Sequence, residues 1–227
     1  MITLEEFRER FINEDINATA AASERHEVEV FIEESIDILT NDYSLITEMK
    51  PCYHDFSKGN RSYKNMHIDA AFLDIPSNVL NLLYADYNEG DVASITNEFI
   101  KRKSQLLINF FENVLKDYFD TAEKSSEAYQ LAENIKKNIE YINKLHLFIA
   151  STNKLSKTVK KIKLPEVSFN DRKIQVVVNI LDIENIYRSK SASFKKDDIV
   201  INCSDYNLEG IPYIKANLDT IEDRKSG

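Results

Sequence analysis

Two strand-like segments joined by a short turn constrain the fold of this chain more than any other feature. Residues 66–73 and 79–87 are rich in residues that favour strands, and the intervening DIPSN, residues 74–78, has turn composition. The second segment contains LNLLYADY, which is almost continuously apolar. Such a run is typical of a central strand that is covered on both faces. The hairpin therefore predicts a sheet with helices on both sides.

Helical patterns precede this hairpin. Thr3 and Glu6 form a capping-box pattern at the start of a first helix. Ser23 is expected to cap a second helix, whose apolar residues step along one face. Residues 43–63 show no regular pattern and contain a clear turn signal. The N-terminal part is thus predicted to be two helices followed by irregular structure.

Two long helices are expected after the hairpin. Asp91 or Ser94 is positioned to cap the first, which is predicted to run to about residue 118. Asp120 begins a second capping-box pattern, and that helix is expected to end near residue 143.

Apolar runs at residues 145–151, 173–181 and 198–202 predict further strands, and Asp182 is expected to cap a short helix over residues 183–190. Strands that alternate with helices indicate the α/β class, with a central sheet flanked by helices.

These elements form a single predicted domain over residues 1–217. Its parts are the N-terminal helices 1–42, the hairpin 64–88, the long helices 91–143 and an α/β part 144–216. Half of residues 218–227 are charged, and we interpret them as a tail that leads to a further C-terminal region. The alternative reading is a frayed C-terminus.

Composition narrows the class of protein. The hydrophobic content of 43% and charged content of 30% fit a globular chain and exclude a disordered one. Cys52 and Cys203 are far apart and form no CxxC motif, which favours a reduced, cytoplasmic location. No apolar run is long enough to span a membrane, and no signal-peptide pattern follows Met1.

Charge is distributed unevenly around a net value of −9. Residues 1–100 carry 20 acidic and 7 basic side chains, which argues against broad adhesion to nucleic acid. The basic stretch from Lys154 to Lys163 leaves two readings open, a local nucleic-acid contact or a solvated surface.

The carboxylates of the hairpin raise the question of a metal site. Asp69 and Asp86 fall on adjacent predicted strands, and Asn88 lies two residues further on the same side as Asp86. Two carboxylates can hold a hard divalent cation such as Mg²⁺, which polarises a phosphate and generates a hydroxide nucleophile. The alternative reading is that both acids are solvated ends of strands. The four histidines show no ligand spacing.

Asn88 departs from the pattern of metal-dependent phosphodiesterases, where a lysine usually follows the second carboxylate by two residues. An amide supplies no positive charge, and loss of one such group typically costs about 100- to 1000-fold in rate. Lys101, Arg102 and Lys103 in the next predicted helix are alternative sources of that charge.

Several segments resemble the N-terminal region of the abortive infection phage resistance (AIPR) family of bacterial defence proteins. The most specific is VVVNILDIENIYRSK at residues 176–190, and the hairpin MHIDAAFLDIPSNVLNLLYADYNEG is second. Three others, VEVFIEESIDILTNDYSL, LHLFIASTNKLS and EGIPYIK, match in the order of the family. Together these segments cover most of the chain.

The resemblance implies a restriction-endonuclease-like fold, named for its PD-(D/E)xK motif, and a larger C-terminal AIPR region as a partner. Carried onto this chain, the metal-site aspartate is Asp69, and the (D/E)xK element falls on Asp86-Tyr87-Asn88. Glu34 is the helix carboxylate that completes the metal site. Asn88 in place of lysine indicates a degenerate branch of the family.

Three functional readings follow. The first is a phage-defence domain that keeps the nuclease-like fold without cleavage and serves interaction or regulation. The second is an active Mg²⁺-dependent DNA or RNA endonuclease, and the third is a structural protein unrelated to defence. A homodimer is compatible with each of them.

Overall fold

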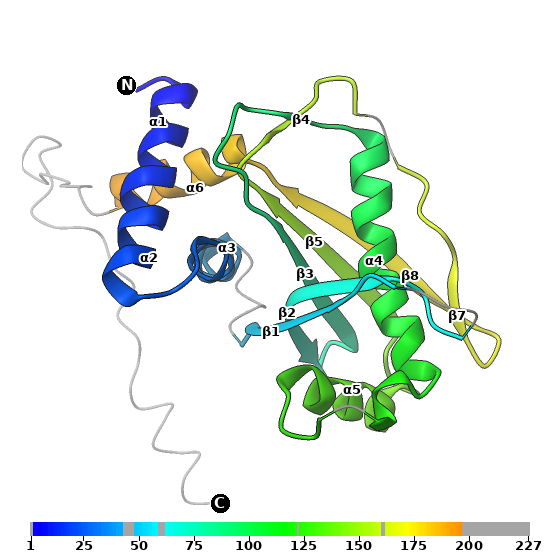
Figure 1. Cartoon of the computed structure of the whole chain (residues 1–227). Helices are drawn as coiled ribbons and strands as arrows, with labels where there is room; N and C mark the ends of the chain where they lie inside the picture. Colours follow the sequence, from blue (N-terminus) through cyan, green and yellow to red (C-terminus); the bar gives the residue numbers. More distant parts are fainter. Residues whose placement is uncertain (1, 43–47, 59–61, 122, 160–161, 197–227) are drawn as a thin grey trace, which may run out of the picture. The chain divides into compact units, whose positions relative to one another are not determined.

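The computed structural model describes residues 2–42, 48–58, 62–121, 123–159 and 162–196 (Figure 1). Residues 1–191 form one compact unit, and a second unit begins at Ala192. The strand predicted for residues 198–202 and the predicted tail lie outside the described residues. The domain limits proposed from the sequence therefore stay predictions.

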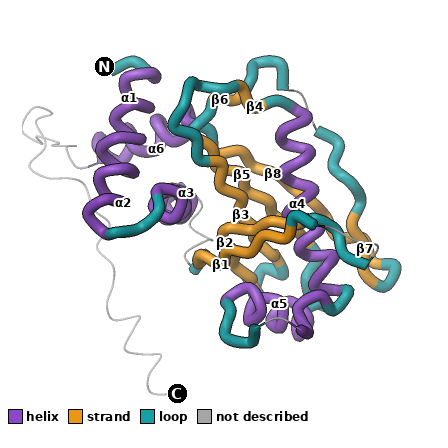
Figure 2. The backbone as a smooth tube through the Cα atoms, in the orientation of Figure 1, coloured by secondary structure: helices purple, strands orange, loops and turns teal. Residues whose placement is uncertain are grey.

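A six-stranded mixed sheet forms the centre of the first unit (Figure 2). The strand order is β1-β2-β3-β5-β8-β7, with the bounds β1 Lys50–Phe56, β2 Met66–Asp74, β3 Val79–Asp86, β5 Lys144–Ser151, β8 Arg172–Leu181 and β7 Val167–Phe169. β3, β5 and β8 run parallel, whereas the pairs β1–β2, β2–β3 and β7–β8 are antiparallel. The predicted α/β class with a mixed, helix-flanked sheet is confirmed.

The predicted hairpin is confirmed as β2 and β3. Asn78 in the turn has a φ of 59°, a left-handed conformation that asparagine tolerates better than most residues. The side chain of Asp74 accepts a hydrogen bond from the backbone N–H of Ser77 at 3.1 Å. Local turn chemistry thus fixes the register in which the two strands pair.

One face of the sheet is covered by α4 (Asn97–Leu115) and α5 (Glu127–Asn138) (Figure 1). Leu82 of the sheet, Phe110 of α4 and Ile135 of α5 are fully buried in the same apolar core. Burial of such side chains supplies the main driving force for folding.

The N-terminal helices and the start of α6 contribute to a second apolar core, on the other face. Their bounds are α1 Leu4–Arg10, the π-helix η1 Phe11–Asn17, α2 Ala18–Ser23, α3 Glu27–Asp42 and α6 Ile183–Lys196. Phe11 and Phe31 are buried in this core together with Phe148 of β5 and Ile186 of α6. The central strands are therefore apolar on both sides, as their sequence predicted.

The start of the chain confirms one predicted cap and corrects another. Thr3 and Glu6 form both hydrogen bonds of the capping box. Ser23 does not begin a helix but ends α2, where its hydroxyl donates to the carbonyl of Thr19 at 2.7 Å. The next helix begins only at Glu27. Asp182 caps α6 as predicted, and accepts from the N–H of Asn185 at 2.9 Å.

The predicted boundaries of the two long helices were wrong. α4 begins at Asn97 and is capped by Thr96, because Ser94–Ile95 form the short strand β4, which pairs with β6 (Lys154–Leu155). α5 is capped by Ser126 and not by Asp120. The pairing of β4 with β6 therefore delays the start of α4, and the cap at Ser126 delays the start of α5.

β1 lies within the segment that was interpreted as irregular. It is an edge strand in which Cys52 alone is buried, so its apolar alternation is weak. Pro51 is tolerated there because an edge strand does not need every N–H for pairing.

Phe148→Ala tests the second core. Phe148 is 0% exposed on a central strand, and loss of such a ring costs about 3–5 kcal/mol because a cavity remains. The measurement is the free energy of unfolding in urea. Tyr141→Ala is the matched control, because Tyr141 is 64% exposed and its loss should change stability by no more than about 0.5 kcal/mol. Equal effects of the two changes would contradict the assignment.

Candidate functional site at the fork between β2 and β3

The regular pairing of β2 with β3 ends at Ala70 and Leu83. Asp69 directly precedes Ala70, and its Oδ2 atom accepts a hydrogen bond from the backbone N–H of Ala85 at 2.7 Å. The register between β1 and β2 also shifts in this region. A carboxylate oxygen thus takes the place of a strand carbonyl where the two strands separate, and we call this point the β2–β3 fork.

The second oxygen of Asp69 binds a histidine. Asp69 is 1% exposed, and its Oδ1 lies 2.9 Å from Nε2 of His67. The other ring nitrogen of His67, Nδ1, lies 3.1 Å from Oδ1 of Asp55. Burial lowers the pKa of His67, but the hydrogen bonds and charges of Asp69 and Asp55 outweigh burial and raise it overall. An imidazolium ring with two N–H donors fits both contacts.

Tyr84 of β3 lies beside this chain of contacts. Its ring centroid is 4.8 Å from that of His67. Burial raises the pKa of the Tyr84 hydroxyl, and the charges of Asp86 and Asp69 raise it further. Tyr84 is therefore a neutral phenol that can both donate and accept a hydrogen bond.

α4 contributes a lysine to the same place. Nζ of Lys103 donates to the hydroxyl of Tyr84 and lies 4.1 Å from the centroid of its ring. Burial lowers the pKa of Lys103 below its ordinary value, and the negative charges of Asp86 and Asp69 offset that effect only in part. The Lys103 ammonium group is therefore within electrostatic reach of both hairpin carboxylates.

Asp86 ends β3 and is anchored on β5. Its Oδ2 atom accepts hydrogen bonds from the hydroxyl of Ser151 at 2.8 Å and from the amide of Asn153 at 3.1 Å. Because β3 and β5 are parallel, their carboxyl ends lie at the same edge of the sheet and these polar groups meet there.

Asn88 belongs to the loop that follows. Its Nδ2 atom donates to the carbonyl of Asp91 and to Oδ1 of Asn153, both at 3.1 Å. Its Oδ1 atom accepts from the N–H of Gly90 at 3.1 Å. The amide therefore shapes the loop, and it shares the Asn153 side chain with Asp86.

A buried arginine holds the same loop from the N-terminal side. The guanidinium of Arg8 donates to the carbonyls of Thr152, Asn88 and Gly90 at 2.9, 2.7 and 2.8 Å. Burial lowers the pKa of Arg8, and the charge of Asp91 partly offsets that.

Glu34 is placed apart from the other predicted residues. It lies on α3, which packs on the sheet face opposite α4 (Figure 1). Its Oε2 atom pairs with Nζ of Lys190 at 2.8 Å, and the same ammonium group pairs with Asp15 at 2.7 Å. The three predicted acids thus have separate partners. Asp69 contacts His67, Asp86 contacts Ser151 and Asn153, and Glu34 contacts Lys190.

Sequence reasoning missed His67 and Tyr84. The available signal was spacing, because His67 lies two residues before Asp69 and such residues share one side of a strand. Within the described ranges, no three His, Cys, Asp or Glu side chains are grouped so that they could hold a metal ion. In those same ranges, no helix combines the length and apolar character that crossing a bilayer requires.

Comparison with known proteins assigns the family. The model of the abortive infection phage resistance protein N-terminal domain matches residues 31–188, which is more than half of the chain. No curated protein and no solved structure matches. The chain belongs to the AIPR N-terminal domain family.

The protonation state of His67 can be measured by NMR. We expect its pKa to lie above the ordinary value of about 6.5, and Asp55→Asn to lower it. Because the folded-state pKa is raised, the resulting stability is complete below about pH 6.5 and is lost as the pH rises through the folded-state pKa. Asp37→Asn, an exposed change on α3, is the control. A His67 pKa at or below 6.5 would refute the assignment.

Proposed function

We propose that this chain is the N-terminal domain of a bacterial phage-defence protein, and that its nuclease-like site serves interaction or regulation without cleaving nucleic acid. Family membership supports the defence role. The observation that carries the non-catalytic role is that both carboxylate oxygens of Asp69 already accept hydrogen bonds, one from His67 and one from the N–H of Ala85.

The fold is compatible with this proposal. A mixed sheet with helices on both faces is the arrangement expected of a restriction-endonuclease-like domain. The resemblance of the hairpin implies that Asp69 and Asp86 are the motif carboxylates. Fold alone does not define activity, so the proposal depends on the contacts of these side chains.

These contacts do not fit a magnesium site. Mg²⁺ binds carboxylate oxygens in a demanding octahedral arrangement. Both oxygens of Asp69 already accept hydrogen bonds, from Ala85 and His67, and Glu34 is paired with Lys190. A divalent cation at Asp69 would have to displace one of these partners inside a buried site.

Protein groups also supply the positive charge that the carboxylates need. A buried carboxylate is costly unless it is paired. His67 lies 2.9 Å from Asp69, and Lys103 of α4 donates to Tyr84, near enough to Asp86 and Asp69 that their charges partly offset the effect of burial on the Lys103 pKa. We infer that internal cations take the electrostatic place of a metal ion, so that the site keeps its shape without one.

A second candidate is an active metal-dependent nuclease, and one observation favours it. Lys103 comes from a different backbone position than the lysine of the motif, yet it lies near both carboxylates. It could supply the charge that Asn88 lacks.

Cleavage assays separate the two candidates. Wild-type chain is incubated with DNA and RNA, single- and double-stranded, in the presence of Mg²⁺ or Mn²⁺. We expect no cleavage above that of Asp69→Asn, because the carboxylates are paired internally. Metal-dependent cleavage that is lost in Asp69→Asn, Asp86→Asn and Lys103→Met but kept in Lys101→Met would establish the second candidate.

A double-mutant cycle tests the internal cation directly. Lys103→Met keeps the length of the side chain and removes its charge, and Asp86→Asn removes the charge of its partner. The two changes should be coupled in unfolding free energy by about 0.5–3 kcal/mol, because each removes the same charge interaction. Lys101→Met with Asp86→Asn is the control pair, and Lys101 is exposed. Additive effects at Lys103 and Asp86 would contradict a charge interaction between these two residues.

A further inference from the structure

The outer edge of β8 is paired over only part of its length. β7 pairs only with residues 172–174 of β8, where Phe169 lies opposite Arg172 and Val167 lies opposite Ile174. The backbone N–H of Gln175 donates to the carbonyl of Asn143, on the side of β5. Because backbone groups alternate along a strand, those of Val176, Val178 and Ile180 point away from β5. At the far end, the amide of Asn185 donates to the carbonyl of Ile180 at 3.0 Å.

Residues 176–180 therefore form an open edge. In the described part of the chain, no strand pairs with β8 beyond β7, and the outward N–H groups of Val176, Val178 and Ile180 have no backbone acceptor. The open edge is about 16 Å long, enough for a short strand. Unpaired edges of this kind are templates for another strand.

Proline explains why β7 does not fill this edge. Continuing the antiparallel register would place Pro165 opposite Val176. Proline has no N–H to donate to the Val176 carbonyl, so the pairing stops. The preceding residues leave the edge and line a groove instead.

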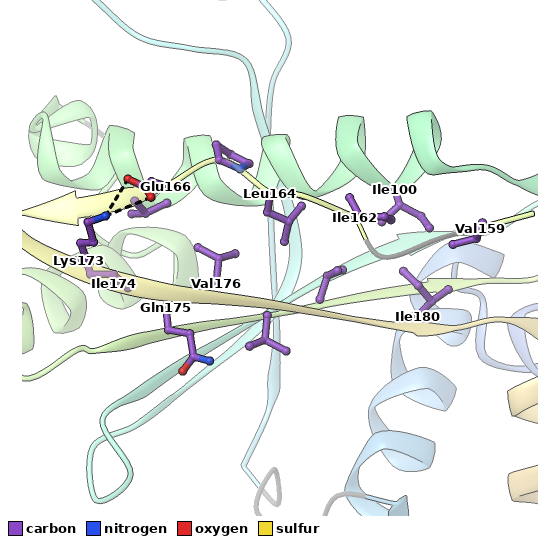
Figure 3. A pocket seen from close by; sticks show the side chains of 14 residues that line it. Ile100, Val159, Ile162, Leu164, Glu166, Lys173, Ile174, Gln175, Val176 and Ile180 are labelled. Carbon is purple, nitrogen blue, oxygen red and sulfur yellow. Dashed lines mark hydrogen bonds and ion pairs between the residues drawn. The ribbon is translucent and has the colours of Figure 1, made fainter.

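The groove lies between this loop and β8 and has a volume of about 690 Å³ (Figure 3). Ile162 and Leu164 of the loop line it together with Val176 and Ile180 of β8 and Ile100 of α4. Its lining is mostly apolar, and it lies directly beside the unpaired backbone groups of the open edge. Main-chain donors and acceptors next to apolar pockets are the two components of strand addition.

Charge defines the flanks of a suitable partner. Lys157 and Lys163 are exposed on the loop. Glu166, the acidic residue that lines the groove, is paired at 3.2 Å with Lys173, so among the described residues of the loop the unpaired charges are those of the two lysines. Both favour a partner with acidic residues beside its apolar ones.

We propose that the open edge of β8 binds an extended segment of a partner protein, with apolar side chains at alternate positions and acidic residues at its ends. The segment continues the line of β7, and its backbone pairs with Val176, with Val178 and with the N–H group of Ile180. Its apolar side chains enter the groove toward Ile162 and Leu164. This binding site is separate from the β2–β3 fork.

A labelled peptide of sequence DDVTVTVDD serves as the probe, and fluorescence anisotropy measures its binding to the full chain. The matched control is the same peptide with N-methyl groups on the alternate amides that face β8. We expect N-methylation to weaken binding roughly tenfold or more, because it removes main-chain donors and leaves the side chains unchanged. Equal binding of the two peptides would overturn strand addition.

Protein variants make the test independent of the peptide chemistry. Val178→Pro removes one outward N–H and should abolish binding. Lys157→Glu with Lys163→Glu leaves the strand intact and should weaken binding several-fold, whereas Lys124→Glu on an exposed loop should not. Circular dichroism verifies that each variant is folded. Unchanged binding by the double lysine variant would remove the acidic flanks from the proposal.

Two further outcomes would contradict a peptide partner and would identify a different one. If a single-stranded oligonucleotide binds and the double lysine variant loses that binding, while the peptide does not bind, the surface recognises nucleic acid. If light scattering shows dimers that Val178→Pro dissociates, and the peptide does not bind, the open edge pairs two copies of the chain.

Discussion

A buried carboxylate holds the sheet together where its hairpin separates. Asp69 replaces a strand partner for the N–H of Ala85, a group that would otherwise be buried without an acceptor. The charge of this acid must be compensated, because ionised groups are stable in a protein interior only when paired. His67 lies 2.9 Å from Asp69 and contributes to that compensation, so the raised pKa of His67 follows in part from Asp69.

The packing of the sheet and the contacts of its buried acids are two separate features of this domain. The strands diverge at Asp69, and this acid is hydrogen-bonded within the protein to His67 and to the N–H of Ala85. The sheet is held by apolar cores on both of its faces. The open edge of β8 is a part of the surface that carries unpaired main-chain groups, and we infer that other molecules bind there.

The sequence pattern correctly predicted those helices and strands whose formation depends on their own residues. The hairpin, the parallel strands and the Asp182 cap belong to this group. The start of α4 was missed because Ser94–Ile95 pair with β6, some sixty residues away. Asp69 and Asp86 were recognised as acids of adjacent strands, and Lys103 as one of three nearby cations. Lys103 differs from Lys101 and Arg102 because the packing of α4 on the sheet turns Lys103 toward Tyr84. That orientation depends on tertiary structure and cannot be read from the sequence.

The first thirty residues lie ahead of the segment that the family model matches, yet they complete the structure. Arg8 ties together three carbonyls of the loops beyond β3 and β5, and Phe11 fills the core above Phe148. The segment matched by the family model is therefore shorter than the packed unit. A chain shortened to the family boundary would expose aromatic surface and release those loops, and its loss of function would say nothing about the acids of the hairpin.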